Sequence, residues 1–75
     1  MVLEKVIKIV AEHLEMDESE ITAETTLADL GVDSLDTVEI LMEMEDEFGI
    51  TIDPGDVHVE KVGELADYIA SILDK

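Results

Sequence analysis

Apolar residues recur at three- and four-residue steps in three separate stretches of the chain. This spacing predicts amphipathic helices over residues 2–15, 34–48 and 61–73, each with one side turned to a common core. The positions that carry the first and last of these patterns are Leu3, Val6, Ile7, Val10 and Leu14, and then Val62, Leu65, Ala66, Ile69, Ile72 and Leu73. The sequence therefore predicts an all-α fold.

The segment between the first two helices, residues 16–30, lacks this spacing. It is rich in Asp, Ser and Thr, which bond their own backbone in turns, so we expect a long loop there. A short helical turn around residues 28–30 is expected within it. The apolar residues Ile21, Leu27 and Leu30 would tie the loop to the core.

The segment between the last two helices predicts one more short element. Gly49 is a favourable residue for ending a helix, and residues 50–52 are expected to form an extended connector. Asp53 followed by Pro54 is typical of a helix start, but Gly55 and the valines after it leave room for only a short, irregular helix. The expected architecture is a small four-helix bundle forming one domain over residues 1–75.

The helix predicted over residues 34–48 has a clear start. Asp33 is a favoured N-cap residue, because its carboxylate can accept a hydrogen bond from a free backbone amide, and Gly31 suits the preceding turn. Asp36 gives a weaker form of the capping box and places negative charge where the helix dipole is positive. We therefore expect Ser34 to be the first residue of this helix.

The same helix carries apolar side chains on two opposite sides, whereas most surface helices have one apolar stripe. At about 100° per residue, the expected core face consists of Thr37, Ile40, Leu41, Met44 and Phe48. The opposite side consists of an apolar strip with an acidic edge, namely Leu35, Val38 and Met42 with Asp36, Glu39, Glu43 and Asp46. Scattered apolar residues are common on protein surfaces, but this placement beside carboxylates favours a docking surface.

The charge balance narrows the choice of partners. Twenty-one Asp and Glu residues against four lysines give a formal net charge of −17, which repels nucleic acid and anionic membranes and favours basic partner proteins. The chain has no cysteine, no apolar run near 18 residues and no secretion signal at its start. We therefore expect a cytoplasmic monomer with no membrane insertion.

Several runs of residues resemble the acyl carrier proteins. The run Leu-Gly-Val-Asp-Ser-Leu-Asp at residues 30–36 carries most of the resemblance, together with Val38, Glu39 and the acidic run that ends at Phe48. Residues 67–69, Asp-Tyr-Ile, fit the closing helix of that family, and the resemblance extends over nearly all 75 residues. In this family the serine of the Asp-Ser-Leu triplet carries a 4′-phosphopantetheine arm through a phosphodiester.

The resemblance implies a role for particular residues. Ser34, flanked by Asp33 and Leu35, would bear the arm, which a phosphopantetheinyl transferase takes from coenzyme A. Acyl chains would be held on the arm as thioesters, and enzymes with basic patches would dock on the acidic helix. The acyl chain would lie between the second and third helices, in a pocket lined by Met44, Ile52, Val59 and Ala66.

The residues give no support to catalysis by the chain itself. Ser34 has no histidine near it in sequence, and His13 and His58 lie in no recognisable triad signature. We expect His13 to face solvent near the end of the first helix and His58 to be a surface residue. No EF-hand loop is present, and we expect no metal site.

The leading interpretation is a carrier for fatty-acid synthesis, and two alternatives stay open. The first is a carrier dedicated to polyketide, nonribosomal peptide or modified-lipid synthesis. It is kept open by the irregular segment after Pro54, where the family often has several acidic residues and then a pair of threonines. The second is an unmodified acidic interaction module, which would leave the Asp-Ser-Leu helix start unexplained.

Overall fold

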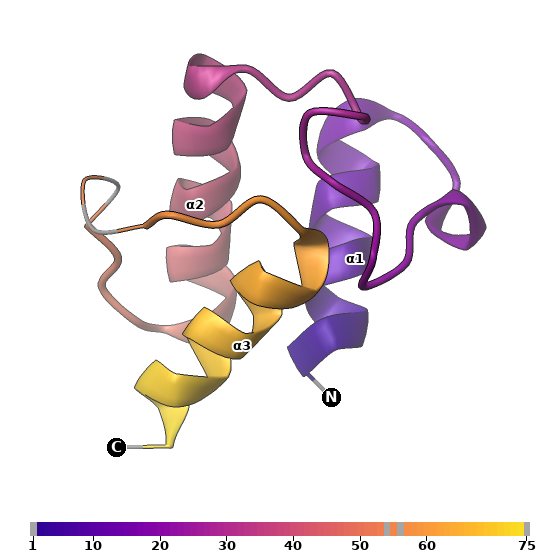
Figure 1. Ribbon diagram of the computed structural model, residues 1–75. Coiled ribbons are helices and arrows are strands. Elements are labelled where there is room, and N and C mark those ends of the chain that lie inside the picture. Colours follow the sequence, from indigo (N-terminus) through magenta and orange to yellow (C-terminus); the bar gives the residue numbers. More distant parts are fainter. Residues whose placement is uncertain (1, 54, 56, 75) are drawn as a thin grey trace.

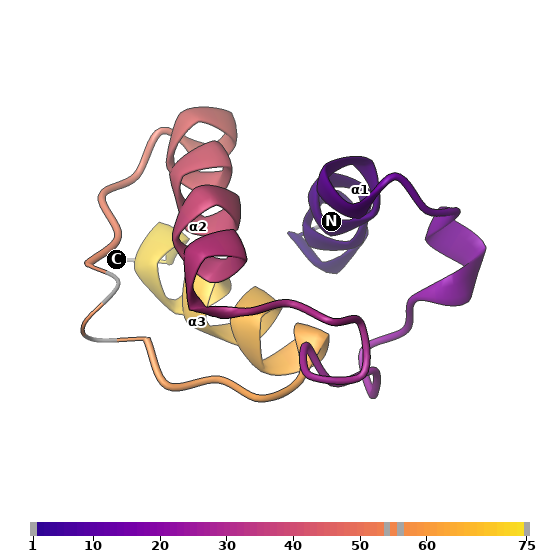
Figure 2. The same cartoon turned by 90° about the horizontal axis from the view of Figure 1, so that it is seen from above.

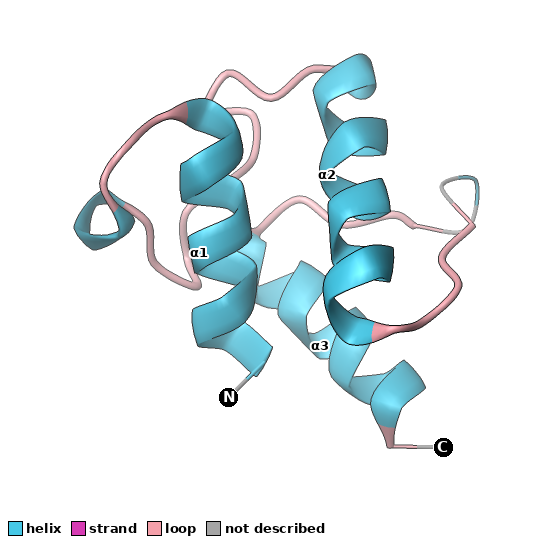
Figure 3. Cartoon of the chain, turned by 180° about the vertical axis from the view of Figure 1, so that it is seen from behind, coloured by secondary structure: helices cyan, strands magenta, loops and turns pink. Residues whose placement is uncertain are grey.

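The computed structural model describes residues 2–53, 55 and 57–74 of the chain. Over these residues it contains helices α1 (Val2–Leu14), α2 (Ser34–Phe48) and α3 (Val62–Leu73), with a short 3-10 helix, η1 (Glu18–Glu20). Helices α1 and α2 run antiparallel, and α3 crosses them obliquely (Figure 1, Figure 2). The described residues form no β-strand (Figure 3), so the predicted all-α class is confirmed.

The core is built entirely from aliphatic side chains and methionine. Helix α1 packs against both α2 and α3, and each of the three helices turns one stripe inward. No polar or charged side chain is buried among the residues described. The buried residues are Val6, Val10, Ala11, Ile21, Leu27, Ile40, Leu41, Met44, Ile52, Val62, Leu65, Ala66 and Ile69.

Helix α2 begins at the residue that the sequence predicts. Asp33 has an extended backbone, and its carboxylate accepts a hydrogen bond from the backbone amide of Asp36 at 2.8 Å. The carboxylate of Asp36 accepts a longer bond, 3.5 Å, from the amide of Asp33, which completes a capping box. Gly31 precedes this cap with a φ of 77°, a conformation that favours glycine. The cap leaves Ser34 as the first helical residue.

The long loop between α1 and α2 is fastened to the start of α3. The Leu27 amide donates to the Glu60 carbonyl, and the Val62 amide donates to the Thr25 carbonyl, both at 2.9 Å. Between these two bonds, Thr26 and Lys61 form an isolated antiparallel bridge. The backbone that precedes α2 therefore has a fixed position relative to α3.

A side chain within its own first turn caps α3. The carboxylate of Glu64 accepts hydrogen bonds from the backbone amides of Glu60 and Lys61 at 2.7 and 2.9 Å. These two bonds hold the pKa of the Glu64 carboxyl below its ordinary value. The helix therefore has an N-terminal cap although it lacks the threonine pair typical of the family.

The predicted four-helix bundle is not confirmed, because the structure has three α-helices over the described residues. Residues 57–60 are not helical, since β-branched Val57 and Val59 have low helix propensity and the Glu60 amide donates to the Glu64 carboxylate instead of to a helical carbonyl. The predicted start of that helix at Pro54, and Asp56 after it, lie outside the described residues.

The short turn expected near residues 28–30 is present, because the Leu30 amide donates to the Leu27 carbonyl and the Gly31 amide to the Ala28 carbonyl, both at 3.1 Å. Those residues form hydrogen-bonded turns, and the short helix of the loop is η1. A capping box made by Asp17 and Glu20 defines η1. None of the described helices combines the length and the apolar character that a membrane span requires.

The two sides of α2 differ enough to be tested with neighbouring residues. Leu41 is 1% exposed and Met42 is 58% exposed. We expect Leu41→Ala to lower the free energy of unfolding by about 2–5 kcal/mol, because it leaves a cavity in the core. Met42→Ala, the matched control, should change it by less than about 0.5 kcal/mol. Urea unfolding followed by circular dichroism measures both, and equal losses would contradict this orientation of α2.

The cap of α2 can be tested by comparing two substitutions of one residue. Asp33→Ala removes the acceptor for the Asp36 amide and should cost about 1 kcal/mol of unfolding free energy. Asp33→Asn keeps an acceptor oxygen, so it should lose only a small part of this unfolding free energy. Thermal or urea unfolding at neutral pH provides the comparison. An alanine variant as stable as the parent would show that the cap does not hold the helix start.

Candidate functional site

Ser34 is an exposed hydroxyl at the N-terminus of α2. The first amides of a helix have no acceptor within the helix. Here the Asp33 carboxylate accepts from the Asp36 amide, and the Asp33 carbonyl accepts from the Thr37 amide. The amides of Ser34 and Leu35 therefore remain available, at the end of the helix where the dipole is positive. This arrangement suits a phosphate group attached to the Ser34 oxygen.

A groove of about 420 Å³ lies beside Ser34. Its walls come from the end of the long loop, from the first turn of α2 and from the segment before α3. Its lining includes the polar residues Asp33, Ser34 and Thr37 of the α2 start and the aliphatic residues Val57 and Val59. The remaining wall residues are Thr26, Leu27, Ala28, Val32 and Glu60. Ser34 thus borders a space that an extended arm could occupy.

The apolar strip of the predicted docking surface is exposed. On α2, Leu35 is 66% exposed, Val38 37% and Met42 58%. Of its acidic edge, Glu39, Glu43 and Asp46 are exposed and Asp36 is half-buried. The strip and its carboxylates therefore form one continuous face of α2 that starts at Ser34.

The four residues predicted for the acyl pocket have two different environments. Met44, Ile52 and Ala66 are buried in the core, with 5% exposure or less. Val59 is half-buried and is the only one of the four that also lines the groove beside Ser34. The pocket itself stays a prediction, because the core residues are packed against one another.

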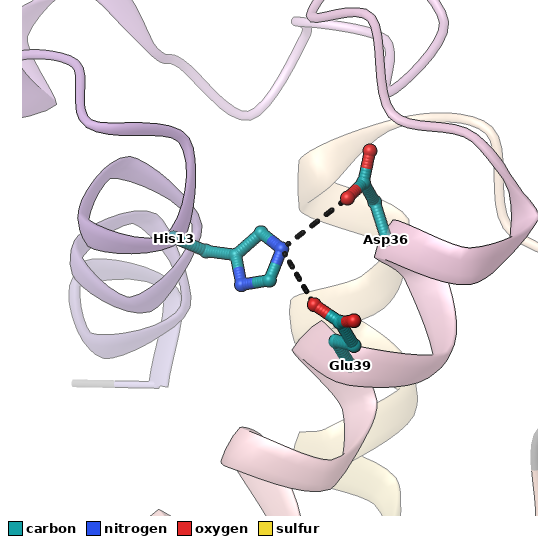
Figure 4. A group of neighbouring side chains, drawn as sticks. All are labelled: His13, Asp36 and Glu39. Carbon is teal, nitrogen blue, oxygen red and sulfur yellow. Dashed lines mark ion pairs between the residues drawn. The ribbon is translucent and has the colours of Figure 1, made fainter.

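The expectation that His13 faces solvent is wrong. Its side chain is only 14% exposed and lies between α1 and α2, where it faces three carboxylates of α2, two of which are drawn in Figure 4. Its Nε2 is 3.5 Å from both Asp36 Oδ1 and Glu39 Oε2, and its Nδ1 is 3.3 Å from Glu43 Oε2. His58 is exposed, as the sequence predicts. Sequence periodicity could not place His13 here, because it does not give the relative rotation of two helices.

Comparison with known proteins agrees with this site. Residues 4–69 match the family described as "Phosphopantetheine attachment site". The fold is similar to the crystal structure of an acyl carrier protein from Thermotoga maritima, with a TM-score of 0.76 and 30% sequence identity. The similarity covers 93% of this chain and 84% of that one.

These findings confirm the resemblance that the helix start and the acidic helix indicate. The matched residues include all of α2, α1 without its first two residues and α3 without its last four. The chain therefore belongs to the acyl carrier protein family, whose members are carriers rather than enzymes and hold 4′-phosphopantetheine as a covalent prosthetic group.

Proposed function

We propose that Ser34 carries the 4′-phosphopantetheine arm and that the chain holds growing acyl groups as thioesters for the enzymes of fatty-acid synthesis. In this proposal residues 1–75 act as one acyl-carrier domain. A phosphopantetheinyl transferase transfers the arm from coenzyme A to the Ser34 oxygen. The observation that supports it most strongly is the exposed hydroxyl of Ser34, the first residue of α2, beside an open groove.

The surroundings of Ser34 fit the phosphodiester of the arm. The amides of Ser34 and Leu35 can donate to phosphate oxygens, and the positive end of the helix dipole favours their charge. The carboxylate of Asp33 would otherwise repel the phosphate, but it accepts a hydrogen bond from the Asp36 amide and is held at the cap. The thiol at the far end of the arm supplies the thioester chemistry, and the protein supplies the attachment point.

The exposed face of α2 would serve as the docking surface for partner enzymes. Leu35, Val38 and Met42 provide apolar contact next to the attachment point. The carboxylates of Asp36, Glu39, Glu43 and Asp46 lie along one edge of this strip, in a chain with a net charge of −17. Basic patches on partners would be attracted at a distance and oriented by these charges, which raises the rate of productive encounter.

The groove beside Ser34 supports a route by which an acyl chain could reach the interior. Val57 and Val59 line the groove, and Val59 is the outermost of the residues predicted for the acyl pocket. Met44 and Ile52 line none of the hollows described and are at most 4% exposed, so an acyl chain could contact them only after the core opens, and Ala66 is 5% exposed. The methionine in this set has an adaptable side chain, which suits such rearrangement.

A carrier dedicated to polyketide, nonribosomal peptide or modified-lipid synthesis is the second candidate. Residues 57–60 favour it, because they lack the regular helix expected between α2 and α3. The acyl group found on the purified protein separates the two candidates. In either case we propose a cytoplasmic monomer that binds neither nucleic acid nor membranes, because its charge opposes both.

Ser34→Ala tests the attachment site directly. Incubation of the chain with coenzyme A and a phosphopantetheinyl transferase should raise the intact mass by about 340 Da, the size of the added group. Ser34→Ala should show no gain, because it lacks the acceptor oxygen. Ser19→Ala, which removes an exposed serine of η1, is the matched control and should gain the full mass. A gain that persists in Ser34→Ala would place the arm on another residue.

Charge reversal tests the docking surface. The double variant Glu39→Lys and Glu43→Lys should raise the KM of the transferase and of acyl-processing enzymes by about tenfold or more, because it removes electrostatic attraction. The control, Asp67→Lys with Asp74→Lys, makes the same change in net charge at exposed positions of α3 and the residue after it. Steady-state kinetics with each enzyme measures the difference. If both double variants raise KM equally, the attraction depends on net charge alone, and the proposal of a docking surface on α2 is contradicted.

A further inference from the structure

The histidine between α1 and α2 has an environment that the proposed function does not use. His13 comes from the last turn of α1, and the three carboxylates that face it come from successive turns of α2. Figure 4 shows its imidazole directed across the gap between the helices toward Asp36 and Glu39. The group therefore combines one nitrogen donor with carboxylate oxygens from a second helix.

The distances in this group are those of ion pairs, and they are also close to the spacing of ligand atoms around a metal ion. His13 Nε2 lies 3.5 Å from an oxygen of Asp36 and 3.5 Å from an oxygen of Glu39. A tetrahedral metal ion with bonds of about 2.0–2.1 Å holds its ligand atoms about 3.3–3.4 Å apart. The three ligand atoms all lie within 4.8 Å of one another. Glu39 is exposed, so its side chain has room to adjust its position in this group.

The second nitrogen of the imidazole also has a suitable partner. Glu43 Oε2 lies 3.3 Å from His13 Nδ1, on the other side of the ring from Asp36 and Glu39. A histidine that binds a metal through one nitrogen commonly donates its other N–H to a carboxylate, which fixes the ring and the tautomer. With the proton on Nδ1, toward Glu43, the lone pair of Nε2 is directed at the other two carboxylates.

We propose that His13, Asp36 and Glu39 form a binding site for Zn²⁺ that bridges α1 and α2, with Glu43 positioning the imidazole. One imidazole nitrogen with two carboxylate oxygens suits Zn²⁺, whereas Mg²⁺ and Ca²⁺ prefer sites made of oxygen alone. Water would complete the coordination, since the site is open on its Glu39 side. The charge of the ion would also offset repulsion within a chain of net charge −17.

The site does not depend on the arm. Two of its ligands, however, belong to the proposed docking surface. An ion bound by Asp36 and Glu39 would compete with basic partners for these carboxylates, a consequence that rests on the proposed function.

Calorimetric titration with ZnCl₂ and MgCl₂ tests the site on the full chain without a purification tag and without the arm, whose thiol would itself bind zinc. We expect one zinc ion per chain, bound at least 100-fold more tightly than magnesium. His13→Gln should lose this preference, and Glu43→Gln should weaken zinc binding by about 10–100-fold. His58→Gln, the same substitution at the exposed histidine, is the matched control and should bind zinc as the parent does.

A spectroscopic measurement on the unmodified sequence keeps the test valid if His13→Gln alters the fold. Nitrogen-15 NMR should show Zn²⁺ shifting the Nε2 resonance of His13 while leaving His58 unchanged. Zinc binding that is no tighter than magnesium binding would overturn the proposal. Equal zinc affinity in His13→Gln and the parent, or a shift at His58 instead of His13, would overturn it as well.

Discussion

The hydrogen bond from the Asp36 amide to the Asp33 carboxylate, 2.8 Å long, determines which residue stands first in α2. Since a helix turns by about 100° per residue, the starting point and the packing of Ile40, Leu41 and Met44 together determine which side chains face outward. The same cap leaves the first two amides of α2 without an acceptor. Position, exposure and electrostatics at the attachment point thus depend on one local interaction.

The sequence was sufficient for features that depend on short-range patterns. The cap at Asp33, the buried and exposed sides of α2 and the left-handed Gly49 at its end all follow from residue types and helical spacing. The same rules could have located η1, because Asp17 and Glu20 have the spacing of a capping box. The loop contains many other turn-forming residues, so the spacing rule alone offers several competing helix starts there.

Other features depend on contacts that spacing does not encode. The environment of His13 requires knowing how α1 and α2 face each other across the core. The end of α1 was predicted one residue late, because Glu15 adopts a φ of 57° where a glycine would be the usual signal. At the end of residues 57–60, the Glu60 carbonyl accepts from the Leu27 amide and the Glu60 amide donates to the Glu64 carboxylate, and neither partner can be read from helical spacing.

The uniform chemistry of the core has a consequence for how the protein could accept cargo. Over the described residues, every buried side chain is aliphatic or methionine, so no side-chain hydrogen bond joins one helix to another in the interior. Dispersion contacts have no strong directional preference, and methionine can follow a changing shape. The helices could therefore separate slightly, surround a flexible hydrocarbon and close again after its release, with only apolar contacts exchanged at each stage.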